Sequence, residues 1–227
     1  MITVAQARPS DRAAFIRRTY MHLAGAILAF IAVEYLLFAT GMAAAMTNLL
    51  AGSRFIWLAI LGAFAILGWF ARSLIARAKS GEQQYLGLGI YVVAQALIFA
   101  PMIYIAAVFG GPDVLPIAAG LTLLLFAGLT AVVFTTRQDF SFLRGFLTIG
   151  GLIALGLILF SVIFGFSLGL FFSGAMVILA SAAILYDTSK VMHHYATTQH
   201  VAAALELFAS VALLFWYVLR IVMALRR

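Results

Sequence analysis

Residues 145–186 decide the fold class: GFLTIGGLIALGLILFSVIFGFSLGLFFSGAMVILASAAILY, a run of 42 residues without one charged side chain. As a single helix this run would be about 63 Å long, about twice the hydrocarbon thickness of a bilayer. The chain must therefore fold back, and the glycine-flanked segment 165–169 is the predicted bend. The stretch predicts two membrane-spanning helices joined by a short loop.

The composition of the whole chain agrees with this prediction. Apolar residues make up 66% of the 227 positions and charged residues 9%, and the mean hydropathy is +1.15. Soluble domains have about 45–50% apolar and about 25% charged residues, so a water-soluble enzyme is excluded. Cysteine is absent, which excludes disulfides and thiolate sites. The net charge of +7 comes from basic residues that flank apolar runs, a pattern typical of membrane insertion and not of nucleic-acid binding.

Five further apolar runs predict the remaining spans, because each is close to the roughly 20 residues that a spanning helix needs. We therefore expect an all-α membrane protein with a cytoplasmic N-terminal tail over residues 1–18 and a seven-helix transmembrane domain over residues 19–227. The five runs are residues 19–40, 55–70, 86–109, 114–134 and 201–223.

The distribution of Lys and Arg predicts the orientation. Seven spans with a cytoplasmic N-terminus place ten of the 14 basic residues inside, Lys79 among them, and only Arg54, Arg220, Arg226 and Arg227 outside. The three arginines at the C-terminus oppose this orientation. Either the last segment crosses the membrane despite them, or it is re-entrant and the C-terminus returns to the cytoplasm; we favour crossing.

Three carboxylates in the predicted spans are candidates for function, because ionisable groups in lipid are costly. For Glu34 we favour a structural interpretation, in which it bonds a neighbouring helix or lies near the outer interface, over a polar pathway. Asp187 ends the sixth span, where it could be solvated, pair with Lys190 three residues on, or belong to a cation or proton pathway. Glu206 lies one helical turn from Ser210 on the seventh span, at a depth near that of Asp187.

Other polar and small residues have simpler interpretations. His193, His194 and His200 are expected to be solvated loop residues, because adjacent histidines on a helix point about 100° apart and do not form a ligand pair. The glycines of 87–89 and 150–151 are expected to let helices approach closely. The sequence has no HExxH helix, phosphate-binding loop or nucleophile elbow, so we predict no metal, no cofactor and no enzymatic activity.

Four segments, in order along the chain, resemble the bacterial Bax-inhibitor-motif family. They correspond to that family's entry to the first span, its loop between spans four and five, the end of its sixth span and its C-terminal ending. The segments are FIRRTYMHLAG (15–25), TRQDFSFL (136–143), ILYDT (184–188) and FWYVLR (215–220).

The resemblance implies a fold in which six helices wrap a central one, located in the bacterial inner membrane. It also implies a pH-sensitive calcium leak through two aspartates. The aspartate of span six corresponds to Asp187, but the aspartate of span seven falls on Ser210, which is a departure from the family pattern. Glu206, one turn away, could substitute for it, and Arg72 matches an arginine of the family's second span.

Two functions of different classes follow. The first is a cation leak, for calcium or protons, with Asp187 in the pathway. The second, which the resemblance also implies for some relatives, is the non-conducting modulation of a membrane-anchored AAA+ quality-control protease or of a stress response. The retained Tyr-Asp-Thr of residues 186–188 favours the first function, and the missing second aspartate favours the second. Such a protease engages a flexible cytoplasmic end, so the N-terminal tail distinguishes the two.

Overall fold

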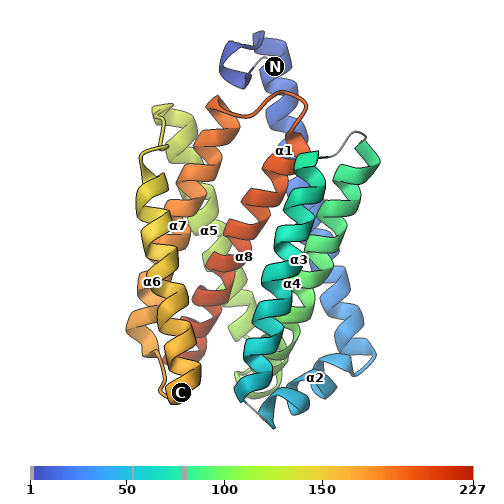
Figure 1. Ribbon diagram of the computed structural model, residues 1–227, viewed down its shortest axis with the longest axis vertical. Coiled ribbons are helices and arrows are strands. Elements are labelled where there is room, and N and C mark those ends of the chain that lie inside the picture. Colours follow the sequence, from blue (N-terminus) through green and yellow to red (C-terminus); the bar gives the residue numbers. More distant parts are fainter. Residues whose placement is uncertain (1–2, 53, 78–80, 227) are drawn as a thin grey trace.

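The chain folds into a bundle of apolar helices (Figure 1). A computed structural model describes residues 3–52, 54–77 and 81–226, and within these ranges it contains no β-strand beyond an isolated bridge between Thr3 and Ala196. Every α-helix except α2 is long and apolar enough to cross a membrane, which confirms the predicted seven-span class. The α-helices are α1 (Pro9–Ala39), α2 (Met42–Ala51), α3 (Arg54–Arg77), α4 (Gly81–Phe109), α5 (Val114–Thr136), α6 (Leu143–Phe164), α7 (Gly169–His193) and α8 (His200–Leu225).

Helix α8 is the central helix. It packs against α1, α3, α4, α5 and α7, whereas α6 packs mainly against α7 and lies at the edge of the bundle (Figure 1). Four leucine side chains of α8 are fully buried: Leu205, Leu207, Leu214 and Leu219. Leucines on several faces of one helix can all be buried only if neighbouring helices surround it. The prediction of a central helix wrapped by the others is thus confirmed.

The predicted bend after the first half of the uncharged run is also confirmed. Helix α6 ends at Phe164, and Gly165 has a φ of 75°. Gly169 begins α7 with a φ of 65°. Backbone with positive φ is readily adopted by glycine and disfavoured for residues with a Cβ atom, so the two glycines set the positions where the chain reverses.

Two features at the N-terminal half differ from the predicted pattern. Helix α1 begins at Pro9, so residues 9–18, expected in the tail, continue the first helix toward the N-terminus. Proline at the first helical position is favourable because its missing N–H would have no partner there. The short helix α2 follows after Gly41 and was not predicted, since its 10 residues are too few to cross a bilayer.

Close helix contacts depend on two of the glycines interpreted as packing positions. A Cβ atom on Gly87 would lie 2.6 Å from the Ile75 side chain and 3.1 Å from the carbonyl oxygen of Ala71, both on α3. A Cβ atom on Gly150 would lie 2.6 Å from the Leu179 side chain on α7. Gly87 and Gly150 confirm the packing interpretation, because small residues let membrane helices approach closely. For Gly89 and Gly151 the interpretation was wrong, since a Cβ atom at either would have nothing within 4 Å.

The two chain termini lie at opposite ends of the bundle (Figure 1). Helix α8 runs through the bundle, and Arg226 Nη1 lies 3.5 Å from Asp113 Oδ2 in the loop between α4 and α5. The last segment therefore crosses the bundle, as favoured above, and is not re-entrant. Lys79 and Arg227, which the charge count includes, lie outside the described residues.

Candidate functional site

The first pair of the candidate site joins the last two helices. Ser210 on α8 donates a hydrogen bond of 2.6 Å from its hydroxyl to Asp187 Oδ2 on α7. Each of these residues is only 7% exposed. Lys190 and Asp187 form no ion pair among the residues that the structure describes, and Lys190 Nζ lies 5.2 Å from the ring centroid of Tyr186 and 5.1 Å from that of Tyr195. Asp187 is therefore a buried residue that contacts the next helix, and not a solvated helix end.

The second pair lies one turn closer to the N-terminal end of α8. Arg72 Nε on α3 donates a hydrogen bond of 3.0 Å to Glu206 Oε1, and the two form an ion pair. The guanidinium also lies 5.4 Å from the ring centroid of Tyr91 on α4. The side chains of Arg72 and Glu206 are 46% and 31% exposed, so this ion pair is partly exposed, unlike the buried Asp187.

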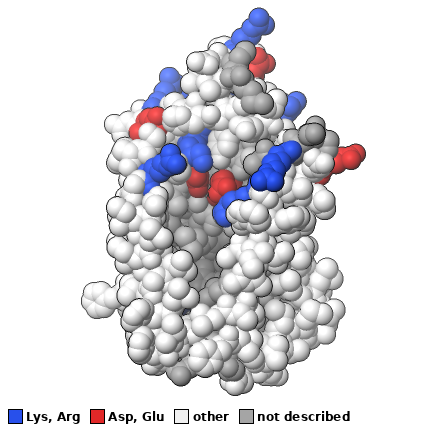
Figure 2. Space-filling model, viewed as in Figure 1, with Lys and Arg blue, Asp and Glu red and all other residues white. Residues whose placement is uncertain are grey.

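Two cavities meet at the Arg72–Glu206 ion pair, which belongs to the lining of both. The smaller, of about 270 Å³, extends toward the loop between α7 and α8, where Tyr195 and Gln199 line it. The larger, of about 650 Å³, extends along α8 toward Arg220 and the loop after α6. Figure 2 shows the molecule hollowed on this face, below a cluster of acidic and basic side chains.

Ser210 lines the larger cavity, but Asp187 lines neither cavity. The serine hydroxyl therefore lies between the cavity and the aspartate. A change at Ser210 would alter how far an ion or a water molecule in the cavity can approach the carboxylate. Tyr195, in the loop between α7 and α8, lines the smaller cavity. Burial raises the pKa of its hydroxyl, and the negative charges of Glu206 and Asp187 raise this pKa further.

All four residues singled out in the sequence thus lie in one region, where α3, α7 and α8 meet. Two residues of α4 that the sequence analysis missed also line the larger cavity: Tyr91 and Gln95, the latter 7% exposed. Their signal was their spacing, because polar residues at i and i+4 on an uncharged span share one helix face.

Glu34 lies apart from this region, on α1. It is 6% exposed, and neither of its carboxylate oxygens has a hydrogen-bond partner among the residues that the structure describes. The interpretation of Glu34 as a group bonded to a neighbouring helix was therefore wrong. The side chain also does not line either of the two cavities at the candidate site.

The histidines near the α7–α8 loop were expected to be solvated loop residues. His194 is exposed, as expected, but His193 ends α7 and His200 begins α8, and all three contact other groups. His193 bonds the Ser189 carbonyl at 3.0 Å, and His200 packs against His22 with ring centroids 4.9 Å apart. His194 Nε2 donates to Asp139 Oδ2 at 2.9 Å, which ties the α5–α6 loop to the end of α7.

The pKa of Asp139 is lowered by this contact and its neighbours. Partial burial acts to raise the pKa of the carboxyl, but hydrogen bonds from the backbone N–H of Ser141 and from His194 outweigh that effect. The proximity of His194 lowers the pKa further when its ring is charged.

The bundle and its polar region define a multi-pass α-helical membrane protein with a partly exposed ion pair in the lining of two cavities. The chain belongs to the family described as inhibitor of apoptosis-promoting Bax1, which matches residues 12–227. This match confirms the resemblance drawn from the four sequence segments.

Individual relatives of the chain include bacterial membrane proteins and a Bax inhibitor. The chain is 41% identical over 112 residues to an uncharacterised protein of Pseudomonas aeruginosa, covering 49% of this chain and 50% of the relative. It is 28% identical over 225 residues to Bax inhibitor 1 of Schizosaccharomyces pombe, covering 96% and 79%. It is 35% identical over 108 residues to YccA of Escherichia coli, named a modulator of FtsH protease in one strain and an inner membrane protein in another, covering 47% and 48%. The chain thus spans about half the length of the bacterial relatives that it matches.

Proposed function

We propose that the protein is a cation leak whose pathway is formed by the two cavities that meet at Arg72 and Glu206. The observation that carries this proposal is the place of the ion pair, since it lines both cavities and no other described residue is common to their linings. An ion that passes from one cavity to the other along their shared lining would pass this pair. Charged groups inside a membrane protein commonly mark ion pathways.

The charges at this junction would control the size of the leak. The positive charge of Arg72 repels a passing cation, and Glu206, at 3.0 Å, offsets that repulsion while the ion pair is intact. Because the pair is partly exposed, water and ions can compete for its two members. A leak would follow when Arg72 moves away and Glu206 becomes free to attract the cation.

The buried pair Asp187 and Ser210 sets the expected affinity for divalent ions. A calcium site uses six to eight oxygen ligands and gains affinity with each carboxylate. Here Asp187 contributes one carboxylate, Ser210 a hydroxyl, and Glu206 is bound to Arg72. We therefore expect weak divalent binding, with calcium or protons passing without being held tightly.

Flux through the purified protein tests the proposal. The protein is reconstituted in liposomes, with one set loaded with a calcium indicator and another with a pH indicator, and the leak is compared with protein-free liposomes. We expect a slow calcium or proton leak in wild type and a smaller one in Glu206→Gln, which removes the negative charge where the two cavities meet. A wild type no leakier than protein-free liposomes in both sets would refute the proposal.

The modulation of a membrane-anchored AAA+ protease is the second candidate, favoured by the name of the YccA relative. In this chain the backbone N–H of Val4 donates to the Tyr195 carbonyl at 2.9 Å, and Val4 is fully buried. A protease would therefore have to detach the N-terminal segment before gripping it. The test uses a purified FtsH-type protease reconstituted in liposomes together with this protein. If wild type and Asp187→Asn inhibit the protease equally and neither causes a leak, modulation is favoured over conduction.

We also propose location in the bacterial inner membrane with the N-terminus in the cytoplasm. The excess of basic residues at the N-terminal end of the bundle supports this orientation. Reporter fusions after Arg18 and after Arg227 are expected to report opposite sides of the membrane, the first cytoplasmic. A periplasmic signal after Arg18 would overturn the orientation.

A further inference from the structure

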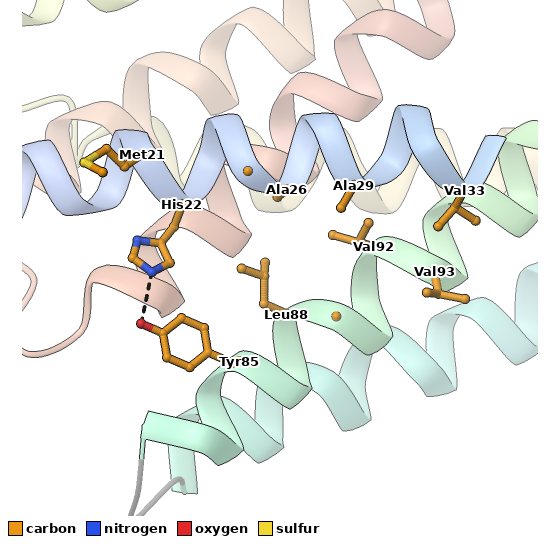
Figure 3. Close-up of a pocket in the computed structure, with 11 residues that line it drawn as sticks. Met21, His22, Ala26, Ala29, Val33, Tyr85, Leu88, Val92 and Val93 are labelled. Atoms are coloured by element: carbon orange, nitrogen blue, oxygen red, sulfur yellow. Dashed lines mark hydrogen bonds between the residues drawn. The ribbon is translucent and has the colours of Figure 1, made fainter. Parts of the chain in front are cut away.

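A groove between α1 and α4 is separate from the two cavities of the candidate site and shares no lining residue with them. It has a volume of about 460 Å³ and follows α1 from Met21 to Val33 (Figure 3). Its base is formed by the buried Ala26, Leu88 and Val92. Apart from one end, the walls are apolar.

The groove is open because glycines, which have no side chain, line both of its walls. Gly25 on α1 and Gly89 on α4 both line the groove, and a Cβ atom added to either glycine would have nothing within 4 Å. Ala29 continues the α1 wall one turn after Gly25. Two neighbouring helices that present small residues usually pack tightly. Here they instead leave an open channel along the bundle surface.

The polar end of the groove is formed by His22 and Tyr85. His22 Nε2 and the Tyr85 hydroxyl are hydrogen-bonded at 3.1 Å (Figure 3), and the rings stack with centroids 5.4 Å apart. The ring of His200 packs against His22. The groove therefore has one polar, hydrogen-bonding end and an apolar body, which is the polarity of a lipid molecule.

Positive charge gathers at the same end. Arg18 precedes His22 by one turn of α1, and its carbonyl oxygen lies 2.6 Å from His22 Nδ1. Helix α4 begins at Gly81, one turn before Tyr85, and helix α8 begins at His200 beside His22. The N-terminus of a helix carries partial positive charge and free N–H groups that favour a phosphate. Glu82 in the first turn of α4 offsets part of this positive charge, but Arg18 and the two helix N-termini together still favour an anion at this end of the groove.

The width of the groove indicates whether a peptide helix or a hydrocarbon chain could occupy it. From Met21 to Val33 is about 18 Å along α1, so the volume of about 460 Å³ corresponds to a mean cross-section of about 26 Å². A helix with its side chains is about 10–12 Å wide and needs about three to four times that area. A hydrocarbon chain, whose carbons contact their neighbours at about 4 Å, fits.

We propose that this groove is a binding site for an anionic phospholipid, with one acyl chain along α1 and α4 and the phosphate at Arg18, His22 and the two helix N-termini. The lipid would be part of the protein's lateral surface at its N-terminal end. The proposal is independent of the cation leak, because neither site contributes residues to the other.

Native mass spectrometry of the detergent-purified protein tests this site. The protein is titrated with phosphatidylglycerol or with phosphatidylcholine carrying the same acyl chains. Wild type should retain phosphatidylglycerol preferentially. Gly89→Leu, which fills the groove from α4, should lower that retention at least about tenfold by removing apolar contact. Gly25→Leu repeats the test from α1, in case either variant fails to fold.

Two further variants separate the contributions. Gly156→Leu on α6 is the matched control, because a Cβ atom there also has nothing within 4 Å, and it should bind as wild type does. Arg18→Gln should reduce the preference for phosphatidylglycerol over phosphatidylcholine by about fivefold. Equal binding of both lipids by wild type, or retention unchanged in folded Gly89→Leu and Gly25→Leu, would overturn the proposal.

Discussion

Neutralising Glu206 is the sharpest test of the proposed pathway, because it changes the charge at the junction of the cavities with almost no change in shape. In wild type Glu206 Oε1 lies 3.0 Å from Arg72 Nε, so the net charge of the pair is close to zero. Glu206→Gln leaves the charge of Arg72 uncompensated. A cation that passes the junction would then be repelled.

The size of the repulsion follows from Coulomb's law. At about 5 Å from the guanidinium, a monovalent cation is repelled by about 1 kcal/mol at the dielectric constant of water and by about 3 kcal/mol at an effective value of 20. Because Arg72 is 46% exposed, screening favours the smaller value. About 1 kcal/mol lowers a monovalent flux about fivefold, and twice that energy lowers a divalent flux about 30-fold.

Liposome flux assays with three variants measure this effect. Arg72→Gln leaves the negative charge of Glu206 and should raise cation flux, and the double variant should return close to wild type. Glu82→Gln, the same chemical change at an exposed carboxylate in the first turn of α4, is the control and should leave flux unchanged. If both single variants shift the flux in the same direction, charge at this junction does not govern passage and the reasoning fails.

Three other predictions concern the surrounding structure. Ser210→Asp, with a second carboxylate at the position now 2.6 Å from Asp187 Oδ2, should gain calcium binding in a radioisotope retention assay, and Asp187→Asn in that background should abolish the gain. Gly87→Leu should lower the melting temperature, by an amount equivalent to about 1–3 kcal/mol, because its Cβ meets Ile75 at 2.6 Å; an unchanged melting temperature would contradict this packing. The pKa of Asp139 is lower in the folded protein than its ordinary value, so the ionised carboxylate stabilises the fold above the ordinary pKa. This stabilisation is lost as the pH falls through the lower native pKa. Asp139→Asn should therefore reduce thermal stability at pH 7, by about 1 kcal/mol or less, and make little difference near pH 2.

Much of the fold was determined by the sequence alone. The uncharged run of residues 145–186 required two spans, and the pair Gly165 and Gly169 located the bend. These features are local in sequence. The number of spans follows from comparing the length of an apolar run with the thickness of a bilayer, and each span is helical because its backbone must satisfy its own hydrogen bonds in lipid. The short helix α2 was missed for the same reason, since no bilayer length marks a helix that does not cross.

The partners of the polar residues were decided only by the tertiary structure. The sequence singled out Arg72, Asp187, Glu206 and Ser210, but it could not show that Arg72 bonds Glu206 while Asp187 bonds Ser210. It also could not show that Glu34 lies buried without a hydrogen-bond partner among the described residues. Arg72 and Glu206 are 134 residues apart in sequence, and their contact depends on the rotation and depth of two helices in the bundle. Those are set by close packing of side chains across helix interfaces, such as Gly87 against Ile75, and no periodicity within one helix encodes them.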